Sequence, residues 1–144
     1  MRRRLEQSER AIARSFVDRL AAQPDQLGSM SFVAAQAPDT SIDMLREMSD
    51  WLRDRLRSAV IVLGAATGER ATIVVGVPPD LVQAGWDAGA LAREIGIAGG
   101  GSGGGRPHLG QAGIRDASRI ADSLERAKQL VAAGVPPSPA GQRR

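Results

Sequence analysis

A run of glycines in the last third of the chain holds the residue types that could do chemistry. Six of the seven residues from Gly99 to Gly105 are glycine, and Arg106 follows directly. Glycine loses the most backbone freedom on folding, so such a run needs a compensating reason. One reason is anion binding, because backbone N–H groups without Cβ atoms can turn toward a phosphate and a guanidinium pairs with it bidentately. A second reason is close approach of backbone to backbone.

Three other interpretations of this run are not supported by its surroundings. A flexible linker is disfavoured because the residues from Arg106 to Gly113 lead directly into a well-patterned helix. The dinucleotide fingerprint G-x-G-x-x-G is matched almost automatically by seven positions so rich in glycine, and no clear strand precedes them. A Walker A loop ends in Gly-Lys-Ser/Thr, whereas Gly105 is followed by Arg106 and Pro107. The sequence therefore does not indicate ATP hydrolysis.

The side chains beside the glycines leave two roles open for Arg106. Backbone N–H groups of Gly103 to Gly105 and the Arg106 guanidinium could bind phosphates, while Gln111 fixes the segment internally. Alternatively, Arg106 pairs with a carboxylate such as Glu94 or Asp116 and braces the segment. His108 is the only histidine, and a lone histidine beside an arginine indicates a surface residue more than a metal ligand. We expect no catalytic residue, no metal and no cofactor.

Composition sets broad limits on the function. The chain has 144 residues, 42% of them hydrophobic, which predicts one globular domain. Aromatic residues make up 3%, which argues against a stacking platform for single-stranded nucleic acid. The net charge is +3 with Lys128 as the only lysine, an arginine bias compatible with nucleic-acid binding that can equally reflect genome composition. No cysteine, membrane-length apolar run or export signal is present, so we expect a soluble, cytoplasmic protein.

Helical periodicity is clearest at the start of the chain. Residues 3–22 are predicted to form an amphipathic helix that ends before Pro24, with one apolar face made of Leu5, Ile12, Phe16 and Leu20. This face must be buried against the rest of the domain or against the same helix of a second chain. A polar break at Gln26–Gly28 then precedes a predicted strand at Ser31–Gln36.

The middle of the chain predicts a helix followed by a hairpin. Thr40 and Asp43 are spaced as a capping box, and the helix runs to about Arg57 with Leu45, Met48, Leu52 and Leu56 on one face and Trp51 at its flank. The apolar runs Ala59–Leu63 and Thr72–Val77 are predicted to form a β-hairpin covered on both faces by helices.

The glycine segment is expected to be a fixed loop between two helical regions. Residues 80–96 predict one or two short helices with Leu91 and Ile95 facing inward. The last helix runs from about Asp116 to Ala133, with its apolar spacing at Ile120, Ala121, Leu124, Ala127 and Val131, and Gly134 closes it. The fold class is therefore α/β (α+β), a small mixed β-sheet covered by helices and preceded by an N-terminal amphipathic helix. The predicted organisation is a helix at 1–24, a globular domain at 30–133 and a disordered tail at 134–144.

Read as a unit, GGSGGGRPHLGQAG at Gly100 to Gly113 resembles the GG-x-GGGRP-x-x-x-QAG signature near the C-terminus of alanyl-tRNA synthetases, in the DHHA1-type domain known as C-Ala. The strand SFVAAQ, the helix ending DWLRDRL, the strands VIVL and TIVVGV and the final helix follow the order expected of that domain. The resemblance covers roughly residues 30 to 133. Ser102 stands where the family often has lysine, and His108 where it often has aspartate.

The resemblance implies a non-catalytic module that contacts the outer corner of tRNA, where the D and T loops meet, and supports aminoacylation and editing during protein biosynthesis. The implied partner is alanine tRNA, and the residues expected to contact it are Gly103, Gly104, Gly105, Arg106, His108 and Gln111. The chain is then a fragment of an alanine–tRNA ligase more readily than a free-standing protein.

Two further functions remain open. The related DHHA1 domain of DHH-family phosphoesterases holds its substrate with a GGGH-type loop, whereas here Arg106 follows the third glycine and no DHH-type cluster is present. This chain would then be a substrate-holding lobe without hydrolysis. The third possibility is a general nucleic-acid-binding or dimerisation module in which residues 3–22 pair with a second copy.

Overall fold

The fold is a single mixed β-sheet with helices on both sides, seen in a computed structural model that describes residues 2–27, 30–38 and 40–133. The predicted tail and the closing Gly134 lie outside the described residues. The elements, in chain order, are α1 (Arg2–Ala22), β1 (Asp25–Leu27), β2 (Met30–Gln36), α2 (Ile42–Arg55), β3 (Ala59–Thr67), β4 (Arg70–Gly76), α3 (Pro79–Gln83), α4 (Ala88–Ala98), β5 (Ser102–Gly105), β6 (Leu109–Ile114), the 3-10 turn η1 (Ala117–Arg119) and α5 (Ile120–Ala132).

The strands are ordered β1-β2-β3-β4-β6-β5 in the part of the chain that the structure describes. β2 and β3 are parallel because α2 carries the chain back between them, and all the other neighbouring pairs are antiparallel. The predicted hairpin of two apolar strands is β3–β4, and each strand is longer than the sequence indicated. The mixed sheet and its leading helix are thus confirmed.

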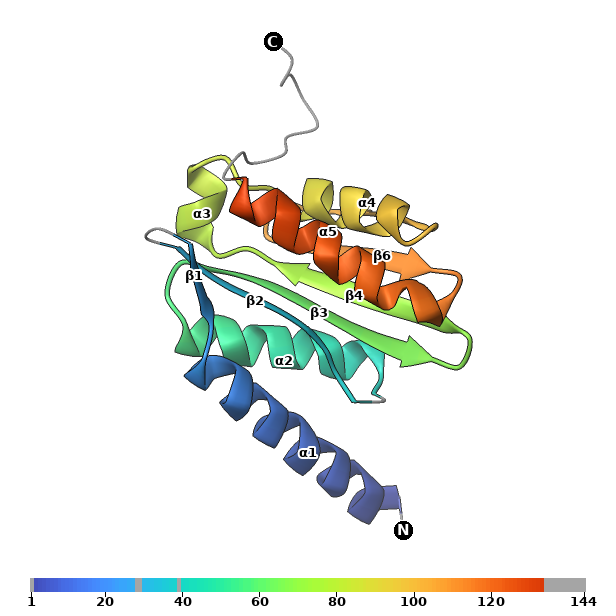
Figure 1. The fold of residues 1–144 in the computed structure, drawn as a ribbon. Coiled ribbons are helices and arrows are strands. Elements are labelled where there is room, and N and C mark those ends of the chain that lie inside the picture. Colours follow the sequence, from blue (N-terminus) through green and yellow to red (C-terminus); the bar gives the residue numbers. More distant parts are fainter. Residues whose placement is uncertain (1, 28–29, 39, 134–144) are drawn as a thin grey trace.

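Helices cover both faces of the sheet, with α1 and α2 on one side and α4 and α5 on the other (Figure 1). Alternate side chains of β3 pack into two separate cores, because successive residues of a strand point to opposite faces. Ile61 and Leu63 pack with the α2 residues Leu45, Met48 and Leu52. On the other face, Val60 and Val62 pack with Leu91 and Ile95 of α4 and with Ile120, Ala127 and Val131 of α5.

Helix α1 packs against its own domain largely through the predicted face, because Phe16 is buried and Leu20 packs against the same core. Ala13, Phe16 and Val17 are buried in the core beneath α2, whereas Ile12 is 56% exposed. The prediction for Ile12 is wrong, because Ala13 and Val17 rather than Ile12 complete the buried stripe. The side chain of Leu5 lies outside the described residues.

Two local predictions in the first half are also wrong. The cap of α2 is Ser41, whose Oγ accepts a hydrogen bond of 3.1 Å from the backbone N–H of Met44. Thr40 is instead buried, and its Oγ1 has no hydrogen-bond partner among the described residues. The break predicted around Gln26 contains the short strand β1, which pairs with β2.

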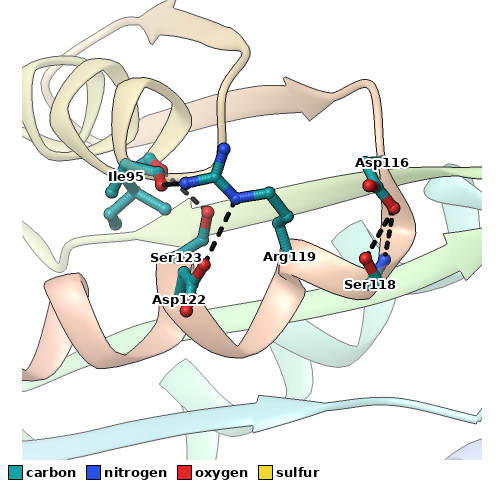
Figure 2. Close-up of polar contacts among 7 residues, drawn as sticks. Ile95, Asp116, Ser118, Arg119, Asp122 and Ser123 are labelled. Carbon is teal, nitrogen blue, oxygen red and sulfur yellow. Dashed lines mark hydrogen bonds and ion pairs between the residues drawn. The ribbon is translucent and has the colours of Figure 1, made fainter.

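The last helix is held to the end of α4 by polar contacts (Figure 2). The buried Ser123 hydroxyl donates a 2.8 Å hydrogen bond to the Ile95 carbonyl, and Arg119 donates one of 2.9 Å to the Ala98 carbonyl. The prediction that Ala121 lies on the buried face of the last helix is wrong, because Ala121 is exposed and Ser123 is buried instead. These bonds fix the point where the chain leaves α4 and enters the glycine run.

Only the first part of the glycine run is irregular, because residues 99–101 form the turn that follows α4. Ser102–Gly105 form β5, an edge strand of the sheet, which pairs with β6 in an antiparallel hairpin whose turn contains Arg106 and His108. The prediction of a fixed loop between two helices is wrong because glycine gives no local strand signal. What makes this segment a strand is its packing beneath α4.

Candidate nucleic-acid interface

Glycines on both sides of the contact let α4 lie directly on the β5–β6 hairpin. A Cβ atom at Gly96 of α4 would lie 2.6 Å from the carbonyl carbon and oxygen of Ser102. Gly103 and Gly110 would collide in the same way with backbone carbonyls of α4. Real Cβ atoms do not approach backbone this closely, so these positions require glycine for close approach of backbone to backbone.

Two glycines of the hairpin have no such requirement. A Cβ atom at Gly104 or Gly113 would meet no atom within 4 Å, and neither residue has a left-handed backbone. Gly105 differs from both, because its φ of +142° disfavours any other residue. Among the three glycines predicted to bind phosphate, packing explains Gly103, backbone conformation explains Gly105, and only Gly104 has no structural reason to be glycine.

The alternation of side chains defines the surface to which Gly104 belongs. Along β6, Gly110, Ala112 and Ile114 are buried toward α4, whereas Gln111 and Gly113 are exposed on the opposite side. Cross-strand register places Ser102 opposite Gly113 and Gly104 opposite Gln111. We name this surface the open hairpin face. It consists of Ser102, Gly104 and Arg106 from the β5 side and of Gln111, Gly113 and Arg115 from the β6 side.

Helix α2 contributes one basic side chain to the open hairpin face. The guanidinium Nη2 of Arg46 donates a 2.6 Å hydrogen bond to Oε1 of Gln111. Gln111 was predicted to fix the glycine segment internally, and the structure shows that its side chain instead contacts α2. Arg46 also lies 3.8 Å from the carboxylate of Asp43. Sequence reasoning missed Arg46, because it lies 65 positions away from Gln111 and no local pattern links the two.

Arg106 and His108 lie with Arg46 around one shallow hollow of about 280 Å³, which we name the tip basin. Its floor includes the backbone of Gly104 and Gly105, and Gln111 also lines it. Both Arg106 and His108 are exposed. The structure therefore brings five of the six predicted site residues to this basin, and Gly103 lies one residue away on the α4 side.

The carboxylates suggested as partners for Arg106 have other partners. Glu94 lies 3.6 Å from the guanidinium of Arg126. Asp116 accepts hydrogen bonds from the backbone N–H and the hydroxyl of Ser118, and these bonds lower the pKa of its carboxyl group below the ordinary value (Figure 2). Arg106 is in none of the ion pairs among the described residues. Its guanidinium is thus available to an external anion.

The outer edge of β5 offers backbone donors beside the tip basin. Arg106 and Leu109 exchange N–H···O bonds of 3.0 and 3.3 Å across the turn. Because alternate residues of an antiparallel pair point their N–H groups in opposite directions, those of Gly103 and Gly105 point away from β6. They face a hollow of about 210 Å³ that Arg93 also lines. Asp87, on the same hollow, caps α4 by accepting a 3.0 Å bond from the N–H of Ala90.

Neither a metal-ligand cluster nor a membrane-spanning helix is found in the described ranges. No group of three or more His, Asp or Glu side chains there could hold a metal ion. No described helix is long and apolar enough to cross a bilayer.

Comparison with known proteins identifies the family. The alanine–tRNA ligase of Roseiflexus sp. (strain RS-1) is 40% identical over 131 residues, which cover 91% of this chain and 14% of that protein. The alanine–tRNA ligase of Roseiflexus castenholzii is 43% identical over 138 residues, which cover 90% of this chain and 15% of that protein. This chain thus spans about one seventh of the length of these relatives.

Two solved structures share the fold. The C-Ala domain of Aquifex aeolicus alanyl-tRNA synthetase superposes with a TM-score of 0.68 at 22% identity, covering 76% of this chain and 98% of that domain. RecJ from Thermus thermophilus, solved in complex with Mn²⁺, superposes with a TM-score of 0.62 at 14% identity, covering 94% of this chain and 18% of RecJ. The sequence itself matches the DHHA1 domain over residues 29–133 of 144, and the chain therefore belongs to the DHHA1 domain family.

Proposed function

We propose that this chain is the non-catalytic, tRNA-binding C-terminal module of a cytoplasmic alanine–tRNA ligase. It contacts the elbow of alanine tRNA and so supports aminoacylation and editing by the other domains of the parent enzyme. Identity of 40–43% to alanine–tRNA ligases over about nine tenths of the chain supports the assignment of the parent protein.

The observation that carries RNA binding is the tip basin. Two guanidinium groups, from Arg46 and Arg106, and the His108 ring surround exposed glycine backbone, and Arg106 is in no ion pair among the described residues. Such a surface binds phosphate through charge and backbone rather than through base stacking, which suits the scarcity of aromatic residues. In this proposal Gly103, Gly104 and Gly105 supply backbone contacts, and Gln111 orients Arg46.

The test is the salt dependence of tRNA binding by the wild type and by Arg106→Ala. Loss of one phosphate contact should weaken binding and reduce the slope of log affinity against log salt by about 1. Lys128→Ala is the matched control, because Lys128 is an exposed cation on α5, across the sheet from the open hairpin face. Thermal unfolding reports whether each variant keeps the fold. Wild-type affinity and slope for Arg106→Ala would exclude this arginine as a tRNA contact.

Specificity for tRNA is tested by comparing alanine tRNA, other tRNAs and duplex DNA at two salt concentrations. Tighter binding of tRNA than of DNA supports an RNA module of an alanine–tRNA ligase. Equal affinity for all three reduces the function to general polyanion binding and contradicts the proposal.

RecJ-like architecture supports a second candidate, the substrate-holding lobe of a DHH-family phosphoesterase. RecJ covers 94% of the chain at a TM-score of 0.62, but its identity of 14% is far below that of the ligases. Turnover of a dinucleotide by this chain with manganese would overturn the assignment to a ligase and show a catalytic activity.

Self-association through α1 is a separate proposal about partners. Ile12 is exposed and borders an apolar hollow of about 250 Å³ between α1 and α2, which Ala13, Pro38 and Met48 also line. A second copy of α1 could cover this hollow. We expect Ile12→Glu to lower the mass measured in solution, and a monomeric wild type would contradict the proposal.

A further inference from the structure

A second basic hollow lies at the end of the open hairpin face opposite the tip basin. Its volume is about 410 Å³, larger than that of the tip basin. Arg70 and Arg115 are its charged side chains, the hydroxyl groups of Thr72 and Ser102 line it as well, and its floor includes the backbone of Gly113. No carboxylate is among its lining residues.

The two arginines face one another across neighbouring strands. β4 and β6 are antiparallel, with Thr72 opposite Gly113 and Ala71 opposite Ile114. The next position beyond that register places Arg70 opposite Arg115, on the same face as Thr72 and Gly113. Like charges directly opposite one another destabilise a sheet, and an anion between them removes the repulsion.

Neither arginine is neutralised within the described part of the chain. The ion pairs there include neither Arg70 nor Arg115, and both side chains are exposed. Glu69 and Asp116 line a separate hollow that Arg115 also borders, but neither forms an ion pair with Arg115, and Asp116 is hydrogen-bonded to Ser118. Two uncompensated guanidinium groups beside hydroxyl groups and exposed glycine backbone match the chemistry of a phosphate.

The two hollows adjoin on the open hairpin face. Gly113 lines one of them and Gly104 lines the other, and neither glycine has a packing reason. From Gln111 at the tip basin to Arg115 is four residues of extended chain, roughly 13 Å. A ligand that reaches both hollows is therefore longer than one phosphate group, and a nucleic-acid strand with its successive backbone phosphates has that length.

We propose that Arg70 and Arg115 form a second phosphate-binding site, and that a nucleic-acid strand lies along the open hairpin face from the tip basin to this site. The choice of nucleic acid as the occupant rests on the proposed function. A protein partner fits less well, because the exposed large apolar side chains among the described residues, Ile12 and Ile97, lie on helices away from this face.

The first experiment compares Arg70→Gln/Arg115→Gln with the wild type in tRNA binding over a series of salt concentrations. Each lost phosphate contact reduces the salt slope by about 0.7–0.9, so the slope should fall by roughly 1.5. Affinity at low salt should fall by about tenfold or more, because two charge-assisted hydrogen-bonding groups are lost. Thermal stability should stay the same or rise, because the variant removes two opposed like charges.

The control is Arg57→Gln/Lys128→Gln, which removes the same two charges from exposed positions that line neither hollow. If both double variants lose affinity and slope equally, only net charge matters and the second site is refuted while tRNA binding stands.

A second experiment decides the site even if the wild type does not bind tRNA. Inorganic pyrophosphate is titrated into ¹⁵N-labelled protein while the amide signals of Gly100, Gly101 and Gly113 are followed. We expect saturable shifts in the wild type that are absent from Arg70→Gln/Arg115→Gln. Shifts without tRNA binding would refute the proposed function and keep an anion site, whereas no shift in the wild type would overturn the second phosphate site.

Discussion

Alanine substitutions at the adjacent positions Gly103 and Gly104 should have opposite effects on stability. Because successive residues of a strand face opposite sides, one new Cβ atom is directed at α4 and the other at solvent. At Gly103 the added Cβ would collide with the backbone carbonyl of Ala92 and lie 3.0 Å from Cβ of Ala112. At Gly104 it would meet nothing within 4 Å.

The magnitudes follow from these contacts. The neighbour of Gly103 is helix backbone, which cannot rotate away as a side chain can, so α4 or β5 must shift. Over-packing of this kind costs about 1–3 kcal/mol, which corresponds to a fall in the melting temperature of roughly 4–12 °C for a domain of this size. Gly104→Ala should be neutral or stabilise by up to about 1 kcal/mol, because alanine restricts the unfolded chain.

Thermal and urea unfolding of the two variants beside the wild type measures this difference. Equal destabilisation by both substitutions would show that the open hairpin face is covered, and the description of the surface would be wrong. Binding supplies a second result. Gly104→Ala should weaken tRNA binding at unchanged stability if RNA lies against the backbone, whereas wild-type binding would exclude close approach there.

The remaining predictions concern stability. Ser41→Ala removes the cap of α2 and should lower the free energy of unfolding in urea by about 1 kcal/mol. Thr40→Val should not destabilise the protein, because it removes a buried hydroxyl without a partner among the described residues. A larger loss of stability for Thr40→Val than for Ser41→Ala would show that Thr40 is the cap. The pKa of Asp116 is lowered in the folded state, so its stabilising effect is present above the ordinary value of 3.8 and is lost as the pH falls through the lowered value. The stability difference between wild type and Asp116→Asn should therefore be constant near neutral pH and shrink once the pH falls below 3.8, and a difference that stays constant in acid would contradict this.

Elements with a strong local signal were predictable from the sequence. The β-branched runs of β3 and β4 and the helical spacing of Leu45, Met48 and Leu52 each carry their own period. The cap at Ser41 was missed by one residue because Thr40 and Ser41 are both good capping residues, and the choice depends on which side chain the core buries.

The candidate site was predictable only in part, because long-range register builds it. The glycine run and Arg106 stand out in the sequence, but nothing local indicates that β5 is a strand beneath α4. Arg46 reaches the site from α2, and Arg70 meets Arg115 only because β4 lies beside β6. Such residues are ordinary exposed arginines until the order of the strands is known.

Some glycines of the family signature are required by the fold and others are not, and this difference changes what a match to the signature means. Four glycines of the signature have structural reasons: Gly103 lies against α4, Gly101 lies against the backbone of Gly113, and Gly100 and Gly105 have positive φ, so a match to those positions reports the fold and says little about RNA. In our proposal, binding depends instead on positions that the fold does not require, namely Gly104 and Gly113 and the arginines around them. A relative that keeps the packing glycines but replaces Arg106 and Arg70 should therefore keep the fold and lose the ability to bind a polyanion.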